Sequence, residues 1–327
     1  MESSKRKRRT SRRAIVIAAF AATFVTAGVF LAHATAPGEN GRIAFRVYFN
    51  EAHTLGSIFT IRPDGTGLIQ VTHRGKVLLD TEPDWSPDGT WIAFYRVAAV
   101  CSCKPTRIFK VRANGTHLTQ ISTDPSVEDV LPAWSPNGKR IAFGRFDDAV
   151  GLVAVFVMRA DGTHVRHVTP SRYAGQAPQW SPDGSRLVFE GVDRKGRGAV
   201  FTIRLDGTHA RRLTPWKLHA GGEPDWSPDG RWIVLESHQE QDRQDNLYLV
   251  HPNGSDLHQI TRSPEHVHQW GSYSFSPDGT MITVSHNLGL GTDPDIVVLN
   301  LDGSGLRDVT NSAAIFESAP DWGPRPI

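Results

Sequence analysis

Trp85-Ser86-Pro87-Asp88-Gly89 is the stretch that decides the fold, because versions of it return along almost the whole chain. Its aromatic residue recurs six times, at Trp85, Trp134, Trp180, Trp226, Phe275 and Trp322. The steps between these residues are 49, 46, 46, 49 and 47. A period this regular, and too short for separate domains, predicts a repeat protein.

Residues 82–122 show what one repeat encodes. A short extended run ends at the motif, whose Pro-Asp-Gly gives a tight turn. The runs 91–95, 108–111 and 118–122 then predict three further strands, with the hairpin signal Asn114-Gly115 between the last two. Each repeat is therefore expected to be an antiparallel unit of four strands, which is the signature of a β-propeller blade.

The two ends of the repeat region predict how the array closes. Asn40–Phe45 matches the second strand of a repeat, whereas the last repeat supplies only a first strand, ending at Trp322–Pro324. Pairing these ends would cover the edges that an open array leaves exposed. The sequence thus predicts an all-β fold over residues 37–327: a six-bladed β-propeller of four-stranded antiparallel blades, closed by N-terminal strands pairing with the C-terminal strand.

The repeat resembles the TolB-type propeller repeat, whose pattern is P-x-W-S-P-D-G-x-x-I-A-F followed by I-Y-V-M-x-x-D-G and R-R-L-T. Pro224–Leu235, Val200–Gly207 and Arg211–Thr214 match it closely, and the resemblance covers residues 40–323. It implies the fold but selects no activity. Such repeats occur in the periplasmic translocation protein TolB, in prolyl oligopeptidase-like peptidases and in oligogalacturonate lyases.

The chain differs from each of these relatives. TolB-like proteins carry an α/β domain before the propeller, where this chain has only its N-terminal segment. The peptidases carry an α/β-hydrolase domain with a G-x-S-x-G elbow, and this sequence has no such motif. We therefore expect a non-catalytic binding propeller without a cofactor.

Residues 1–36 predict export. Residues 1–13 hold seven Lys or Arg and one acid, and the stretch 14–32 is uncharged and mostly apolar. This order is typical of a secretory signal, with the Ala34–Thr35 bond as the favoured cleavage point. The apolar stretch is also long enough to stay as a membrane anchor. Both alternatives place residues 37–327 outside the cytoplasm: periplasmic, secreted, or tethered to the membrane through residues 14–32.

The net charge of +2 is unevenly distributed along the chain. Beyond residue 13 there are 29 basic and 33 acidic residues, a net charge of −4. Nucleic-acid partners need a basic face, so none is expected. The expected partner is a protein or peptide of the cell envelope, or a glycan. Cys101 and Cys103 would either form a strained loop disulfide or remain two loop cysteines without a catalytic role.

The long, dissimilar loops predict the binding face. In a four-stranded blade the turns after strands one and three share one face, and the connections after strands two and four share the other. The first set is short and uniform, whereas the second varies, and variable loops on a rigid scaffold favour binding. The candidate ligand-binding residues are Glu82, Arg172, Tyr173, Gln176, Trp216, Glu223 and Glu317. The acids beside the aromatic residue, such as Asp84, are expected to accept hydrogen bonds from neighbouring backbone.

Four histidines give an alternative prediction. His266 and His268 lie two residues apart, so on a strand their rings would point the same way, and His238 and His286 lie on loops of adjoining blades. Their convergence would create a metal site, and the chain would be a metal-assisted polysaccharide lyase or hydrolase. The competing interpretation is four solvated loop histidines, because no second short motif supports them. A sensor domain tethered by residues 14–32 is a further alternative.

Overall fold

The computed structural model describes residues 37–73, 78–98, 106–147, 152–170, 174–239, 244–262, 270–287, 293–312 and 316–326. These residues form β-strands and one short 3-10 helix, η1 (Trp216–Leu218). The predicted all-β class is confirmed. The described residues include no helix with the length and apolarity needed to cross a bilayer, and residues 1–36 lie outside them.

The strands group into units of four, here called the first to the sixth unit. The first unit joins the two ends of the repeat region and contains β24 (Glu317–Pro324), β1 (Asn40–Tyr48), β2 (Gly56–Ile61) and β3 (Ile69–Gln70). The second unit contains β4 (Leu78–Trp85), β5 (Trp91–Ala98), β6 (Arg107–Arg112) and β7 (Thr119–Gln120). The third contains β8 (Glu128–Trp134), β9 (Arg140–Asp147), β10 (Leu152–Arg159) and β11 (Arg166–His167).

The remaining units repeat the same order. The fourth contains β12 (Ala174–Trp180), β13 (Arg186–Val192), β14 (Gly198–Arg204) and β15 (Arg211–Arg212). The fifth contains β16 (Ala220–Trp226), β17 (Ile233–Gln239), β18 (Gln244–Val250) and β19 (His258–Gln259). The sixth contains β20 (Trp270–Phe275), β21 (Met281–His286), β22 (Asp295–Asn300) and β23 (Arg307–Asp308).

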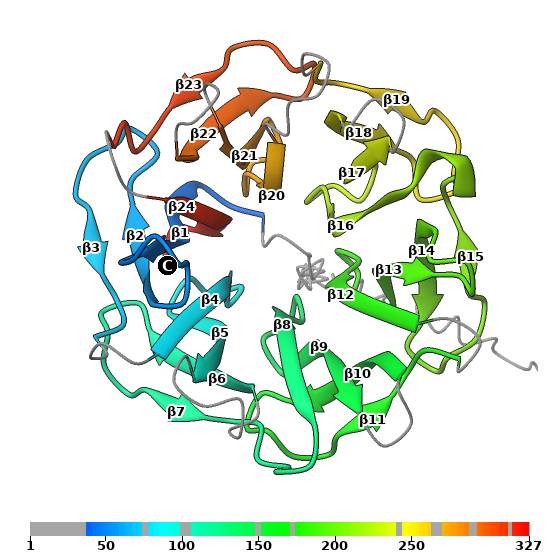
Figure 1. The fold of residues 1–327 in the computed structure, drawn as a ribbon, viewed down its shortest axis with the longest axis horizontal. Coiled ribbons are helices and arrows are strands. Elements are labelled where there is room, and N and C mark those ends of the chain that lie inside the picture. Colours follow the sequence, from blue (N-terminus) through cyan, green and yellow to red (C-terminus); the bar gives the residue numbers. More distant parts are fainter. Residues whose placement is uncertain are drawn as a thin grey trace, which may run out of the picture. The chain divides into compact units, whose positions relative to one another are not determined.

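Pairing within every unit is antiparallel, as the repeated hairpin signals require. A single parallel pair, Gly56 with Leu79, joins the first two units into one eight-stranded sheet, and the other four units are separate sheets. Figure 1 shows the units arranged around a common centre, with β4, β8, β12, β16, β20 and β24 innermost. Each inner strand contacts the next, and β24 contacts both β20 and β4.

The aromatic residue of each repeat lies between neighbouring units. Trp180 packs against Ala133 and Val155 of the preceding unit, and Phe275 packs against Val234 of the fifth. The same arrangement holds for Trp85 with Ala44 and Ile58, Trp134 with Ala93 and Ile108, Trp226 with Val188 and Val200, and Trp322 with Ile296 and Val298. Burial of these large apolar surfaces stabilises the packing of neighbouring sheets by about 25 cal/mol per Å².

Candidate functional site

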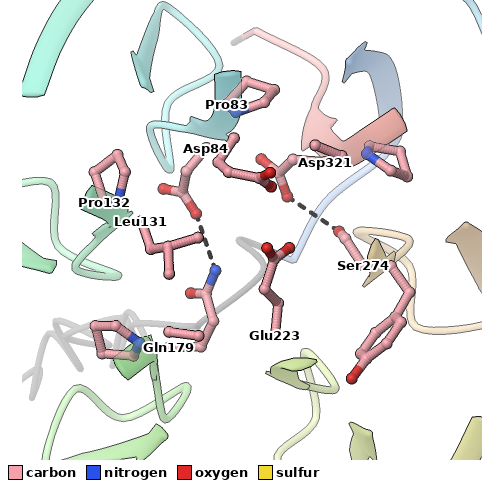
Figure 2. Close-up of a pocket in the computed structure, with 14 residues that line it drawn as sticks. Pro83, Asp84, Leu131, Pro132, Gln179, Glu223, Ser274 and Asp321 are labelled. Carbon is pink, nitrogen blue, oxygen red and sulfur yellow. Dashed lines mark hydrogen bonds between the residues drawn. The ribbon is translucent and has the colours of Figure 1, made fainter. Parts of the chain in front are cut away.

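The inner strands surround a narrow central cavity with a volume of ≈ 40 Å³ (Figure 2). Every unit contributes to its wall through residues directly before its repeat aromatic. The lining residues are Glu82, Pro83, Asp84, Leu131, Pro132, Ala177, Pro178, Gln179, Glu223, Tyr273, Ser274, Ala319, Pro320 and Asp321. The repeat therefore presents equivalent positions of several strands to one central space.

A backbone irregularity turns these residues toward the cavity. In the inner strands the pairing register shifts two to five residues before the repeat aromatic, as between Thr81 and Asp84. The residue three places before the aromatic has a left-handed backbone at Glu82 (φ 48°), Leu131 (52°), Ala177 (48°) and Ala319 (56°). Non-glycine residues adopt this region at a cost, and such bulges recur beside functional sites because they re-aim a side chain. In β16 the left-handed residue is Gly222 (φ 76°), directly before Glu223.

Three aspartates one residue before the aromatic link neighbouring units. Asp84 Oδ2 accepts the Trp134 backbone N–H at 2.6 Å, and Asp225 Oδ2 accepts that of Phe275 at 2.9 Å. Asp321 Oδ2 accepts the Trp85 N–H at 2.6 Å, which connects the first unit to the second. The expected bonds to backbone are thus present, and each of the three also reaches the next unit; Asp225 Oδ1 in addition accepts the Trp226 N–H of its own strand at 2.8 Å.

The remaining contacts of these carboxylates tie them to the cavity wall (Figure 2). Gln179 Nε2 donates to Asp84 Oδ1 at 3.2 Å, and Ser274 Oγ donates to Asp321 Oδ1 at 3.0 Å. Asp84, Asp225 and Asp321 are therefore held in fixed positions close to one another, where their charges repel.

Two glutamates of the cavity wall also lie near each other. The carboxyl groups of Glu223 and Glu82 lie within hydrogen-bonding reach of each other, and Arg46 Nη1 lies 3.3 Å from Glu82 Oε1. Arg46 also donates to Ser318 and Thr81, so its guanidinium is already engaged by the protein. One arginine thus faces a cluster of five acids at the centre of the molecule.

Burial and mutual repulsion change the protonation of the cluster. Burial, followed by the charge of Asp321, raises the pKa of Asp84 well above its usual range. Burial also raises the pKa of Asp321 to about 6. For Glu223, burial and the proximity of Glu82 raise the pKa well above its ordinary value. Burial and mutual repulsion thus favour the protonated forms of these carboxyl groups, whereas an entering cation would favour their charged forms.

The arrangement suits binding of a positively charged group. Carboxylate oxygens held in a buried space attract a cation more strongly than they would in water. The residues that line the central cavity include no histidine, cysteine or lysine that would serve as a nucleophile or general base. Within the described ranges, no three His, Cys, Asp or Glu side chains are grouped to hold a metal ion.

The structure brings together only part of the predicted set of ligand residues. Glu82 and Glu223 meet in the central cavity, whereas Glu317 is 4% exposed and lines a separate one. Gln176 Nε2 donates to Glu190 Oε2 at 2.8 Å within the fourth unit. Trp216 packs on Phe201 and lies under the guanidinium groups of Arg197 and Arg212. Arg172 and Tyr173 lie outside the described residues.

The alternative histidine site stays a prediction. His266, His268 and the side chain of His238 lie outside the described residues. His286 is buried against Trp270, with ring centroids 4.0 Å apart, and burial lowers its pKa to about 4. Cys101 and Cys103 also lie outside the described part of the chain, as do parts of several long loops of the predicted binding face.

Sequence reasoning missed three residues of the site. Arg46 comes from the strand next to the inner one, so only the register of β1 against β24 reveals its position. Tyr273 and Ser274 occupy the places that Pro and Asp hold in three other copies. The loss of the repeated proline before Phe275 was a readable signal, because a repeat that departs from its own pattern marks a local specialisation.

This fold and this cavity define a protein of the β-propeller class. The family model of the TolB beta propeller domain matches residues 113–325. The chain belongs to this family, and the predicted TolB-type resemblance is confirmed.

Individual relatives agree with the family assignment. A protein TolB homolog of Chlorobium luteolum is 30% identical over 149 residues, which are 44% of this chain and 30% of the relative. The chain spans about a third of the length of this relative. TolB from Acinetobacter baumannii superimposes with a TM-score of 0.68 at 20% identity, covering 88% of this chain and 68% of that one.

The same fold also occurs in other contexts. Hydrazine synthase of Kuenenia stuttgartiensis superimposes with a TM-score of 0.71 at 14% identity, covering 91% of this chain and 50% of that one. Likeness at such low identity shows the fold alone, so function must be argued from the site.

Proposed function

We propose that the chain is an exported six-bladed β-propeller that binds, without catalysis, a protein or peptide of the cell envelope. In this proposal the six units are the blades, and residues 37–327 form one domain. The pairing of β1 with β24 supports closure, as does the Asp321 bond to the Trp85 backbone N–H. The contacts of β24 with both β4 and β20 support it as well.

The acid cluster at the propeller centre is the main support for the proposed binding role. Burying carboxyl groups together costs free energy, and burial and the proximity of Glu82 raise the pKa of Glu223. A cationic group supplied by a partner would offset that cost. The partner is therefore a protein or peptide that presents a lysine side chain or an amino terminus.

The size of the cavity favours a peptide over a glycan. A volume of ≈ 40 Å³ accommodates an ammonium group in place of water but is too small for a sugar ring. Residues 1–36 would deliver the propeller to the envelope, either as a cleaved signal or as an anchor. Fusion of alkaline phosphatase after residue 60, with and without residues 14–32, tests this, because the enzyme is active only outside the cytoplasm.

Selection of peptides from a random displayed library tests the binding role. We expect the immobilised full chain to enrich sequences with a lysine or a free amino terminus, by about tenfold over neutral sequences. The double variant Glu82→Gln, Glu223→Gln keeps the shape of the cavity and should lose this enrichment. Glu128→Gln, at an exposed acid of β8, is the matched control. Enrichment without charge preference, or enrichment of lysine or amino-terminal sequences that survives the double variant, would overturn the proposal.

A further inference from the structure

A second cavity lies in the first unit, away from the central one. It has a volume of ≈ 700 Å³ and lies among the end of β1, the connection to β2 and the start of β24. Its lining contains aromatic and acidic side chains and no lysine or arginine. The lining residues that matter here are Val47, Tyr48, Phe59, Phe316 and Glu317.

The second and third units show what can occupy the equivalent position. In the second unit Asp80 pairs across the strands with Arg96, whose Nε and Nη2 lie 2.5 and 2.8 Å from its carboxylate oxygens. In the third unit Asp129 pairs in the same way with Arg145, at 2.7 and 3.0 Å. Both acids stand five residues before the repeat aromatic. The second and third units therefore share a buried bidentate carboxylate–guanidinium pair at this position, whereas the fourth to sixth units have other residues there.

An aromatic ring completes each of these pairs. The Arg96 guanidinium lies 4.4 Å from the ring centroid of Phe109, and that of Arg145 lies 4.9 Å from the centroid of Phe156. A guanidinium over an aromatic face gains a cation–π interaction in addition to its ion pair.

The first unit keeps the acid and the ring but lacks the arginine. Glu317 stands five residues before Trp322, and its partner across the strands is Val47. Phe59 pairs with Phe45 as Phe109 pairs with Phe94, so it holds the place of the stacking ring. Because the side chain of Val47 is short, it leaves the space between Glu317 and Phe59 unfilled. This space, where a guanidinium would lie, opens into the cavity.

The Glu317 carboxyl has an oxygen without a hydrogen-bond partner, as expected if the guanidinium of the other two units is missing here. Thr310 and Ser312 hydrogen-bond to the Glu317 carboxyl, yet its Oε2 is buried and has no hydrogen-bond partner. Arg46, the neighbour of Val47, is engaged by Glu82 and Ser318 instead. A buried acceptor left unsatisfied is costly, and a ligand cation would satisfy it.

The cavity around this position can hold more than the cation. The rings of Tyr48, His53 and Phe316 pack on one another, with centroid separations of 4.7 Å, 5.2 Å and 4.2 Å. They offer an apolar wall for the methylene chain that carries a guanidinium.

We propose that this cavity binds the guanidinium group of an arginine side chain, which takes the place that Arg96 and Arg145 hold in their own units. The inference goes beyond the proposed scaffold role and rests on the first unit alone. The guanidinium would bridge Glu317 and Phe59, with its aliphatic chain along the aromatic wall.

Calorimetric titration of the full chain with Nα-acetyl-L-arginine amide tests the site. The corresponding citrulline amide is the matched probe, because it has nearly the same shape without the charge. We expect the arginine probe to bind at least about tenfold more tightly than the citrulline probe. Binding of the acetylated amide but not of free L-arginine would assign the ligand to a peptide, and equal binding of the two would assign it to the amino acid.

Two variants locate the binding. Glu317→Gln should weaken binding of the arginine probe at least about tenfold. Val47→Arg rebuilds the internal pair of the second and third units, so it should remain folded and abolish binding. Glu128→Gln, at an exposed acid of β8 outside this cavity, is the control and should bind as the natural chain does.

Three outcomes would overturn the inference: equal affinity for the two probes, undiminished binding by Val47→Arg, or loss of binding in Glu82→Gln. The last would move the ligand to the central cavity. If Glu317→Gln does not fold, binding of the arginine probe by Val47→Arg still tests the inference. A failed peptide selection would not count against this site. The selection tests the central cavity, and its double variant changes no residue of the first unit's cavity.

Discussion

At the scale of single residues, the central carboxyl groups combine two roles that oppose each other. Asp321 bonds the backbone of the next unit, which stabilises the assembly of sheets. Its burial near Asp84 makes the charged form unfavourable, so its pKa rises to about 6. An acid whose pKa is raised by folding stabilises the folded state most below its unfolded pKa, and that contribution is lost as pH rises through the folded value.

The variant Asp321→Asn should make this loss measurable. The amide oxygen can still accept the Trp85 N–H, but the side chain no longer titrates. From pH 4 to pH 6.5 we expect the free energy of unfolding of the variant to improve relative to the natural chain by about 2 kcal/mol. Urea unfolding at several pH values measures the difference, with Glu128→Gln as the exposed control. A difference that does not depend on pH would contradict the assignment.

At the scale of elements, the irregular inner strands position the site at the expense of regular pairing. Each shift of register interrupts the ladder between an inner strand and its neighbour. At four of these shifts the left-handed residue is not glycine: Glu82, Leu131, Ala177 and Ala319. The strands therefore carry strain at the cavity wall, where it directs side chains inward.

Replacing Ala177 with glycine should release part of this strain. A left-handed alanine costs roughly 1–2 kcal/mol, whereas the added freedom of glycine in the unfolded chain costs roughly 0.5–1 kcal/mol. We expect Ala177→Gly to raise the free energy of unfolding by about 0.5 kcal/mol. Ala142→Gly, in the regular part of β9, should lower it by about 1 kcal/mol. Equal destabilisation by both changes, seen in denaturant unfolding, would show that the bulge is not strained.

At the scale of the whole molecule, β24 completes the first unit from the far end of the chain. It supplies Trp322 to the core between the sixth and first units and Asp321 to the bond with Trp85. Removing it would expose the edge of β1 and the apolar residues that Trp322 covers.

A chain that ends at residue 315 should therefore lose its cooperative unfolding transition. A synthetic peptide of residues 316–326, added in excess, should restore it by pairing with β1. The Trp322→Ala version of the peptide serves as the control and should restore it poorly. If the shortened chain unfolds at the same urea concentration as the full chain, β24 contributes nothing to closure.

The sequence predicted the parts of the fold that repeat. Trp85 and its equivalents set the period, and the Asp-Gly turns set the strand order, because each signal is local and occurs several times. Glu82 and Glu223 were candidate ligand residues, and each lies three residues before its repeat aromatic and lines the central cavity.

The parts that do not repeat escaped prediction. The left-handed backbone at Leu131 and Ala177 has no sequence signal, since neither residue type favours it. The open position beside Glu317 depends on which residue faces it across the strands. That residue is Val47, and the pairing that places it there joins opposite ends of the chain.

The pairing of β1 with β24 also sets the mechanical behaviour of the molecule. Asn40 lies opposite Pro324, so the two ends of the repeat region leave the molecule side by side. A force that pulls these ends apart acts perpendicular to the strands rather than along them. The antiparallel residue pairs then separate one after another. Traction on the chain would therefore peel β24 away first and leave the other units unloaded until that strand had gone.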